Sequence, residues 1–304
     1  MRFSVIIPAH GDEELRERTL KSVRDQGVEC EILVIGVGEN LSASEARNRG
    51  IERAHGDYLV FCDDDDALEA GALKYLSEII DAEAPDAINY AYREVASLDD
   101  AAVFERGALE RFDFRDPKDA VRGFKRLFTW LWAWNTCYRR ETIAKLRFRD
   151  FLAGEDTLFG AEAMALFGKV VRTDVALYRY LQHDKSILHS PSRRQVLDGE
   201  KSILAMLEAA KKLKWFEELR TFAYARTRKL LVHYVFKYGA RVPASESLGV
   251  WRDFKAVAKE FLVSSPEFSY FSRLYYRALL APWFDAVVSR LSLARIYSCL
   301  HSLG

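Results

Sequence analysis

Four consecutive aspartates, Asp63–Asp66, follow a short apolar run, Tyr58–Phe61, which is typical of a strand buried in a parallel sheet. A run of acids is most often a solvated turn, because adjacent carboxylates repel one another. Ligands of open α/β sheets, however, bind at the carboxyl ends of strands, where these side chains must lie. If the backbone stays extended, Asp63 and Asp65 point to one side and suit Mg²⁺ or Mn²⁺ carried by a diphosphate. We therefore interpret the run as a metal–diphosphate site.

A second pair of acids, Glu155 and Asp156, follows Gly154 and precedes apolar residues at helical spacing. Acids in a first helical turn commonly just complement the helix dipole. The same position also keeps a carboxylate ionised at neutral pH, which suits a general base. His183 lies beyond the next expected strand; a lone loop histidine is more often incidental, but we retain it as a metal or phosphate contact.

The stretch 130–138 is dense in aromatic residues, among them Trp132 and Trp134. Tryptophan usually buries itself, so packing in the core is one interpretation. The other is a wall that stacks on a sugar, because aromatic faces suit the apolar faces of a pyranose ring. Arg139 and Arg140 follow directly and would either meet an anionic group or lie in solvent.

Apolar periodicity predicts alternating strands and helices over the first 95 residues. Strands are expected at 3–7, 31–35, 58–61 and 86–95, with helices at 13–26, from a cap at Ser42 or Ser44 to Gly56, and at 70–82. This alternation favours parallel pairing with right-handed crossovers, hence a Rossmann-like, mostly parallel α/β sheet flanked by helices. The segment Gly36–Gly38 lacks the third glycine of a dinucleotide fingerprint, which argues against a nicotinamide enzyme.

The pattern beyond residue 95 is weaker and then becomes helical. An antiparallel strand is expected at 109–114, helices at 117–128 and 157–167, and a strand at 169–178 followed by a loop at 180–186. Helical spacing then covers 194–213, 215–238, 245–263 and 267–301, with breaks near Pro266 and Pro282. We expect a C-terminal helical annex.

Composition restricts the class of protein. The 45 basic and 45 acidic residues balance, so bulk charge does not indicate a nucleic-acid binder. Four scattered cysteines suit a reducing cytosol better than disulfides or a zinc site. The N-terminal apolar stretch is too short for a signal peptide, and no apolar run reaches the ~18 residues of a membrane span. We expect a cytoplasmic protein.

The last segment, 270–304, combines aromatic residues with four arginines and one acid, Asp285. Basic amphipathic helices of this kind can lie on anionic lipid. An ordinary helical bundle is the alternative. We expect peripheral contact with the inner face of the cell membrane through 245–304.

The motifs, taken in order, resemble the inverting family 2 glycosyltransferases of the GT-A fold, of the bacterial polysaccharide and glycolipid type. The matching residues are Ser4–Pro8, His10, Glu13, Leu20–Val23, Gln26, Ala46–Asn48, Gly50, Gly56–Asp66, Trp134–Asn135, Tyr138–Glu141, Gly154–Phe159 and Gln182–Ile187. Each motif alone is weak, whereas the ordered set is specific. The resemblance covers residues 3–190.

The resemblance implies roles for particular residues. The nucleotide-sugar site would comprise Pro8, His10, Glu13, Arg47, Asp63 and Asp64. Asp63, Asp65 and His183 would bind Mg²⁺ or Mn²⁺, and Trp134, Asn135 and Arg139 would bind the acceptor. Asp156 would be the catalytic base, with Glu155 beside it. The catalytic domain would be 1–190, with the donor bound by 1–95 and the acceptor by 96–190, and 191–304 would be the helical region.

The implied reaction is a single displacement. The cation offsets charge on the departing nucleoside diphosphate, and the base takes a proton from an acceptor hydroxyl that attacks the opposite face of the sugar, with inversion. We expect a UDP-sugar donor and a saccharide or glycolipid acceptor in surface polysaccharide synthesis. The family's usual nucleobase-binding acid is replaced by Gly36-Val37, which leaves the nucleobase open unless Glu39 substitutes.

Two other functions remain open from the sequence. A nucleotidyltransferase that makes sugar nucleotides shares the sheet and the acidic metal site, but it needs a glycine-rich basic loop after the first strand. Here the segment Pro8–Glu14 is acidic instead. A non-catalytic nucleotide-sugar-binding or scaffold protein is the other alternative.

Overall fold

The computed structural model describes residues 2–10, 12–100, 102–128, 131–182, 191–264 and 269–301. The chain forms two compact units. The first comprises Met1–Asp150 with Phe159–His183, and the second comprises Phe151–Leu158 with Asp184–Gly304. The expected division into domains 1–190 and 191–304 stays a prediction.

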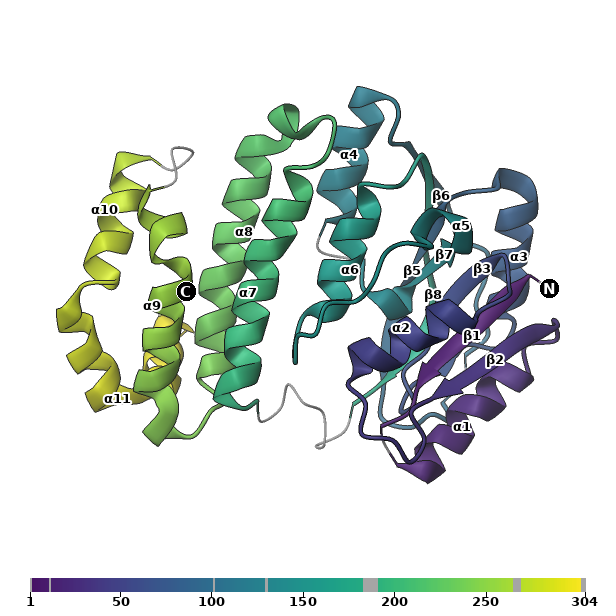
Figure 1. Ribbon diagram of the computed structural model, residues 1–304, viewed down its shortest axis with the longest axis horizontal. Helices are drawn as coiled ribbons and strands as arrows, with labels where there is room; N and C mark the ends of the chain where they lie inside the picture. The colour runs from purple at the N-terminus through teal and green to yellow at the C-terminus, as the bar shows by residue number, and fades with distance from the viewer. Residues whose placement is uncertain are drawn as a thin grey trace. The chain divides into compact units, whose positions relative to one another are not determined.

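The first unit is built on one mixed sheet (Figure 1). Its strand order is β2 (Cys30–Ile35), β1 (Phe3–Pro8), β3 (Tyr58–Phe61), β7 (Thr136–Arg139), β5 (Ala87–Val95), β8 (Lys169–Leu181) and β4 (Ala67–Leu68), with β6 (Leu109–Asp113) on β8. Among these described strands, β1, β2, β3, β5 and β8 run in one direction, and β4, β6 and β7 run in the other. The expected α/β sheet and its parallel first three strands are confirmed.

Both faces of this sheet are buried, as the apolar strand sequences predict. On one face, Val5 and Val60 pack in one apolar cluster with side chains of α1 (Glu13–Arg24) and α3 (Ala72–Glu83). On the other face, Ile6 lies against Gly50 of α2 (Ala43–Arg53), where an added Cβ would come within 2.3 Å of the isoleucine. The remaining helices that begin in this unit are α4 (Pro117–Leu127) and the short α5 (Arg140–Ile143).

Three strands differ from the prediction. β7 lies antiparallel between β3 and β5, so β5 does not adjoin β3 as the simple alternation suggests. Four residues are too few to show a period, and the aromatic stretch before them hides the strand. The two-residue β4 is missed for the same reason. β8 also extends through Tyr180 and Leu181, which were expected in a loop, because Glu94 and Val95 at the end of β5 pair with them.

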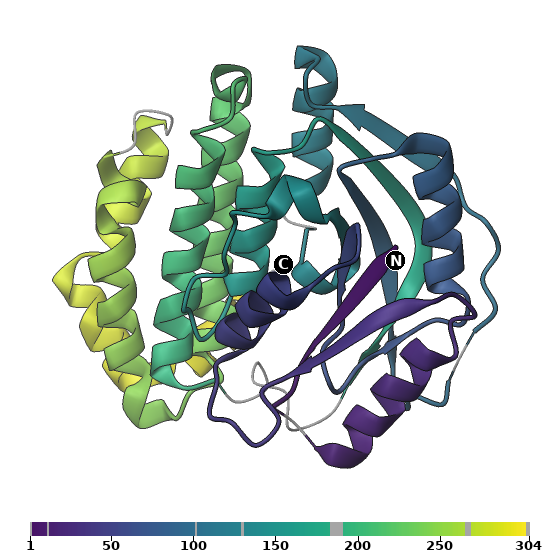
Figure 2. The same ribbon diagram turned by 45° about the vertical axis from the view of Figure 1, so that its right-hand side comes forward.

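The second unit contains the expected helices. They are α7 (Arg193–Ala210), α8 (Phe216–Gly239), α9 (Ser247–Ser264), α10 (Tyr270–Leu279) and α11 (Pro282–His301), and α7 and α8 lie side by side in Figures 1 and 2. Ser192 and Gln195 form a capping box that starts α7. Fully buried Trp251 and Phe254 of α9 are part of the apolar core of this unit. Within the described ranges, no helix has the length and apolarity needed to span a membrane.

A buried acid in α7 makes the stability of the protein depend on pH. Glu200 is fully buried, and neither carboxylate oxygen has a hydrogen-bond partner among the described residues. Burial, followed by the nearby charge of Asp253, raises the pKa of the Glu200 carboxyl well above its usual range. The folded state binds the Glu200 proton more tightly than the unfolded state does. The stability gained from this proton is present below the unfolded-state pKa of about 4.3 and is lost as the pH rises through the folded-state pKa.

We expect Glu200→Gln, which cannot ionise, to raise the free energy of unfolding at pH 8 by about 1–3 kcal/mol and to change it little at pH 4. Urea denaturation of both proteins at the two pH values measures this difference. The matched control is Glu208→Gln in the same helix, because Glu208 is exposed and pairs with Lys211 at 2.6 Å. An equal gain in both variants, or a gain that does not depend on pH, would contradict the prediction.

Candidate functional site

The four aspartates after β3 form a turn, in which the Asp66 N–H donates to the Asp63 carbonyl at 3.1 Å. The expectation of an extended backbone through Asp65 is therefore wrong, because the chain turns to enter β4. The carboxylates nevertheless divide by burial: Asp64 and Asp66 are buried, whereas Asp63 and Asp65 are half-buried. We call residues Asp63–Asp66 the aspartate turn.

The two buried carboxylates tie the aspartate turn to neighbouring strands. Asp66 accepts hydrogen bonds from the Tyr178 hydroxyl at 2.7 Å and from the Leu181 N–H at 2.8 Å. Burial, followed by the charges of Asp65 and Asp63, raises the pKa of the Asp66 carboxyl well above its usual range. Asp64 accepts a hydrogen bond from the His10 N–H at 2.9 Å, which links the turn to the segment after β1.

Asp63 is held from the neighbouring helix α2. Its carboxylate lies 2.7 Å from an Nη of Arg47, whose side chain is only 5% exposed. The guanidinium carbon also lies 5.4 Å from the centroid of the Phe148 ring. A charge-assisted bond from a buried arginine orients Asp63 and reduces the repulsion among the four acids.

The aspartate turn fits a cation that arrives with a diphosphate better than a self-contained metal cage. Asp63 and Asp65 offer the carboxylate oxygens that Mg²⁺ and Mn²⁺ prefer. Over the described ranges, no cluster of three or more His, Cys, Asp or Glu side chains could hold an ion by itself. Mg²⁺ commonly binds one or two carboxylates together with phosphate oxygens and water, so two acids are enough. His183, the third expected ligand, lies outside the described residues, as does the rest of its loop to 190.

The expected nucleotide-binding residues gather at the same edge of the sheet, because β1, β2 and β3 are parallel neighbours. Pro8 ends β1 and is buried, and the side chains of His10 and Glu13 are exposed. Val37, which follows β2, is 56% exposed, whereas Glu39 pairs with Arg49 at 2.6 Å. The carboxyl ends of three strands thus bring these residues and Asp63 to one edge, where open α/β sheets bind ligands.

The tryptophan-rich segment forms part of an aromatic wall, which comprises Tyr92, Trp132, Trp134, Tyr178 and Tyr180. Trp134 is 8% exposed and stacks on Tyr178 with ring centroids 4.9 Å apart and on Trp132 at 5.1 Å. The Tyr178 hydroxyl accepts a hydrogen bond from the Asp63 N–H at 3.1 Å, so the aromatic wall adjoins the aspartate turn. Packing in the core thus accounts for Trp134. The half-buried members of the aromatic wall are Tyr92, Trp132 and Tyr180.

Sequence reasoning did not single out Tyr92 and Tyr180. The available signal was their spacing, since each lies two residues from another tyrosine within a strand, Tyr90 and Tyr178. The strand that contains Tyr92 was predicted, but the strand that contains Tyr180 was expected to end at Tyr178, so the two tyrosine pairs could not be matched.

The other two expected acceptor residues lie at opposite ends of β7: Asn135 precedes this strand, beside the carboxyl end of β3, and Arg139 is its last residue. Asn135 is buried, and its carbonyl accepts a hydrogen bond from the Asn89 side chain at 3.2 Å. Arg139 lies opposite Tyr58, the first residue of β3, with its guanidinium carbon 5.1 Å from the Tyr58 ring centroid. Asp63 lies two residues beyond Phe61, the last residue of β3, so Arg139 lies at the opposite end of that strand.

Glu155 and Asp156 are the first two residues of α6 (Glu155–Met164), two residues earlier than the predicted helix start. Asp156 accepts a hydrogen bond from the Thr157 N–H at 2.7 Å, and both acids are half-buried. They belong to the second compact unit, whereas α6 continues beyond Leu158 into the first. Both acids thus lie in a first helical turn, where a carboxylate complements the helix dipole.

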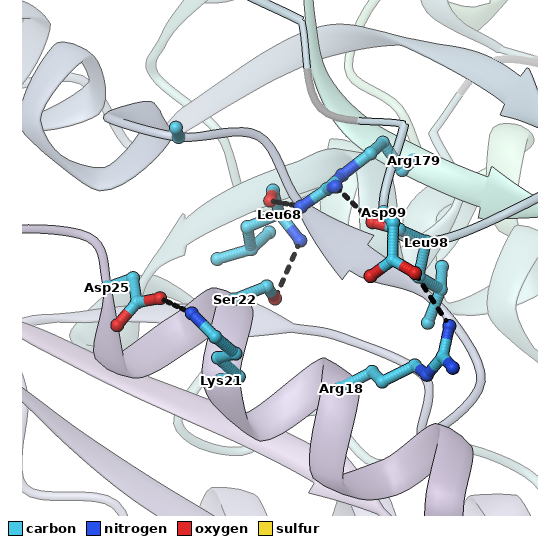
Figure 3. A pocket seen from close by; sticks show the side chains of 9 residues that line it. Arg18, Lys21, Ser22, Asp25, Leu68, Leu98, Asp99 and Arg179 are labelled. Carbon is cyan, nitrogen blue, oxygen red and sulfur yellow. Dashed lines mark hydrogen bonds and ion pairs between the residues drawn. The ribbon is translucent and has the colours of Figure 1, made fainter.

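A cavity of about 250 Å³ lies between α1, β4 and the segment 98–99, and its lining is drawn in Figure 3. Its charged side chains already have partners: Arg18 lies 3.0 Å from Asp99, Lys21 pairs with Asp25, and Arg179 donates to the Leu68 carbonyl at 2.8 Å. None of the residues that line it is an expected donor-site residue. We therefore place the candidate site at the aspartate turn.

Comparison with known proteins identifies the family that part of the first unit matches. Residues 32–128 match the family model described as glycosyl transferase family 2. These residues belong to glycosyl transferase family 2. The matched part of this family 2 domain contains Arg47 and the aspartate turn, and it ends before the aromatic segment and Asp156.

Two bacterial glycosyltransferases are similar to the family 2 domain and its surroundings. Glycosyltransferase GlyA of Streptococcus pneumoniae serotype 4 is 25% identical over an alignment of 215 residues, with 59% of this chain covered. The putative glycosyltransferase EpsH of Bacillus subtilis strain 168 is 25% identical over 259 residues, with 72% of this chain and 73% of EpsH covered. The match spans only 30% of the length of GlyA.

Two solved structures share the fold of this chain. TarS residues 1–349 of S. aureus in complex with UDP-GlcNAc aligns with a TM-score of 0.67 at 16% identity, covering 100% of this chain and 92% of that one. The mannosyltransferase PcManGT of Pyrobaculum calidifontis, with GDP-Man and Mn²⁺, aligns with a TM-score of 0.50 at 12% identity, covering 99% and 87%. The predicted GT-A fold with a helical C-terminal region is confirmed.

Proposed function

We propose that this protein is a metal-dependent, inverting glycosyltransferase that moves a sugar from a UDP-sugar to a hydroxyl of a saccharide or glycolipid. The observation that carries this proposal is the aspartate turn, which presents Asp63 and Asp65 at the carboxyl end of β3 within the family 2 match. The complexes of TarS with UDP-GlcNAc and of PcManGT with GDP-Man and Mn²⁺ support a nucleotide-sugar donor and a divalent cation.

On the donor side, Asp63 and Asp65 would hold the cation together with the diphosphate oxygens. When bound, Mg²⁺ or Mn²⁺ supplies positive charge that stabilises the departing diphosphate. Arg47 orients Asp63, and the buried Asp64 and Asp66 fix the turn against β1 and β8. The Asp63 carboxylate and the backbone of the turn are thus held in place before any ligand arrives, which reduces the entropy lost on binding.

On the acceptor side, Asp156 is the base that takes the proton of the attacking hydroxyl. One carboxylate that activates a nucleophile across the sugar ring gives inversion at the anomeric carbon. Two of the half-buried members of the aromatic wall, Trp132 and Tyr180, offer ring faces on which a pyranose can stack beside the aspartate turn.

A donor screen tests this function. The protein is incubated with UDP-, GDP-, CDP- and dTDP-sugars and mixed saccharide acceptors in Mn²⁺, Mg²⁺ or EDTA, and release of nucleoside diphosphate is measured. We expect release from a UDP-sugar with a cation and none in EDTA. Absence of release from every donor, together with absence of cation-dependent thermal stabilisation by every nucleotide, would contradict the proposal.

The two alternatives are weaker. A nucleotidyltransferase needs a phosphate-binding loop after β1, but here Asp12 caps α1 by accepting from the Glu14 N–H, so a carboxylate already occupies that helix start. Release of pyrophosphate from a nucleoside triphosphate in the same screen would favour it. A scaffold protein would bind nucleotide without turnover.

We also propose peripheral contact with the inner face of the membrane through 245–304, in line with synthesis of surface polysaccharide. Exposed Leu274 and Trp283 support it. We expect co-sedimentation with anionic vesicles at low ionic strength, reversed by salt. Equal binding to neutral vesicles, or none to anionic ones, would contradict this contact.

A further inference from the structure

The chain enters α6 through a tight turn at Gly154. The φ angle of Gly154 is +79°, in the left-handed region that favours glycine. Its carbonyl accepts the first hydrogen bond of the helix, from the Leu158 N–H at 3.1 Å. Gly154 therefore sets the direction of the first helical turn, which contains Glu155 and Asp156.

A buried serine of α7 holds this same carbonyl. The Ser202 hydroxyl is 1% exposed and donates to the Gly154 carbonyl at 2.5 Å. A Cβ added to Gly154 would come within 2.9 Å of the Ser202 oxygen, so the two residues lie in direct contact. The hydrogen bond thus fixes the residue immediately before the two acids.

A second residue of α7 holds the chain two residues earlier. Asp198, which is 1% exposed, accepts from the Leu152 N–H at 3.3 Å and from Arg194 at 3.0 Å. Residues four apart on a helix share one face, so Asp198 and Ser202 form a pair of polar contacts along α7. All of these residues belong to the same compact unit, Phe151–Leu158 with Asp184–Gly304.

The charges of Glu155 and Asp156 also affect a residue of α8, Tyr234. The Tyr234 hydroxyl of α8 lies against Gly199 of α7, where an added Cβ would come within 2.1 Å of it. Burial, followed by the charges of Tyr238, Glu200, Glu155 and Asp156, raises the pKa of Tyr234. The charges of both acids thus act on a buried side chain of α8, and the backbone before the acids is hydrogen-bonded to α7.

We propose that Ser202 and Asp198 are positioning residues for the catalytic base, acting on Asp156 through the backbone of residues 152–154. This inference rests on the proposed function, in which Asp156 takes the proton of the acceptor hydroxyl. The inference is drawn from two buried polar side chains of α7, each hydrogen-bonded to the backbone that precedes Asp156. Small misplacement of a catalytic group lowers the rate steeply, whereas donor binding at the aspartate turn does not depend on these contacts.

The first test is the split between turnover and binding. We expect Ser202→Ala to lower kcat about 10–100-fold while the donor KM stays within about twofold. Ser202→Thr, which keeps the hydroxyl, should recover most of the loss. The control is Thr227→Val in α8, which removes a buried hydroxyl that has no hydrogen bond among the described residues, and its kcat should equal that of the wild type. Ser202→Cys replaces alanine if the alanine variant does not fold.

A double-mutant cycle separates this inference from the proposed function. If Ser202 acts through Asp156, Ser202→Ala should lower kcat no further in an Asp156→Asn background. Wild-type kcat in Ser202→Ala, or an equal fall in both backgrounds, would overturn the positioning role alone. Full turnover in Asp156→Asn would instead overturn the proposed base.

Discussion

Asp156→Asn should lower the rate of sugar transfer by about 10²–10⁴-fold, which is the usual contribution of a general base. The amide keeps the size of the side chain and can still accept from the Thr157 N–H, which lies 2.7 Å from the carboxylate, so the start of α6 should be preserved. It cannot take a proton at neutral pH. Initial rates at saturating donor and acceptor measure the loss.

Donor affinity serves as the internal control for Asp156→Asn, because the proposed donor contacts are made at the aspartate turn and should stay within about twofold. Glu155→Gln is the matched variant in the same helical turn, and we expect a much smaller loss of transfer from it. Equal losses in the two variants, or wild-type turnover in Asp156→Asn, would show that Asp156 is not the base.

Asp65→Ala should remove cation-dependent use of the donor. Asp65 is a half-buried carboxylate of the aspartate turn, and loss of a ligand to a bridging cation is worth several kcal/mol, or at least about 100-fold in the donor KM. Steady-state rates over a range of Mn²⁺ concentrations measure the change. We expect excess Mn²⁺ to restore only part of the activity.

The matched control for Asp65→Ala is Asp66→Asn in the same turn. The Asp66 carboxylate is buried and bonded to Tyr178 and Leu181, so its replacement should lower thermal stability and leave the donor KM of the folded protein nearly unchanged. If Asp66→Asn and Asp65→Ala raised KM equally, the division of the turn into buried and ligand-facing acids would be wrong.

Strand periodicity predicted the sheet around the site well, because long apolar runs such as Phe3–Pro8 carry a clear signal. It could not place β7, because a four-residue strand has no period of its own and its partners in β3 and β5 lie 47–81 residues earlier in the chain. Pairing of such distant segments is decided by tertiary structure, which local pattern does not contain.

The composition of the aspartate turn was evident from the sequence, but its internal division was not. Four identical residues give no sign that Asp64 bonds to the His10 backbone or that Asp66 bonds to β8. The α7 contacts to the chain before Asp156 were also hidden, since Ser202 lies 48 residues beyond Gly154. Both features depend on side-chain hydrogen bonds between segments far apart in sequence.

Titration calorimetry of UDP into the wild-type protein, with Mn²⁺ and then with EDTA, tests the central claim most directly. A cation held by Asp63 and Asp65 should make UDP binding depend on Mn²⁺, and Asp65→Ala should abolish the Mn²⁺-dependent heat. UDP binding of equal affinity in EDTA, or unchanged Mn²⁺-dependent binding in Asp65→Ala, would contradict it.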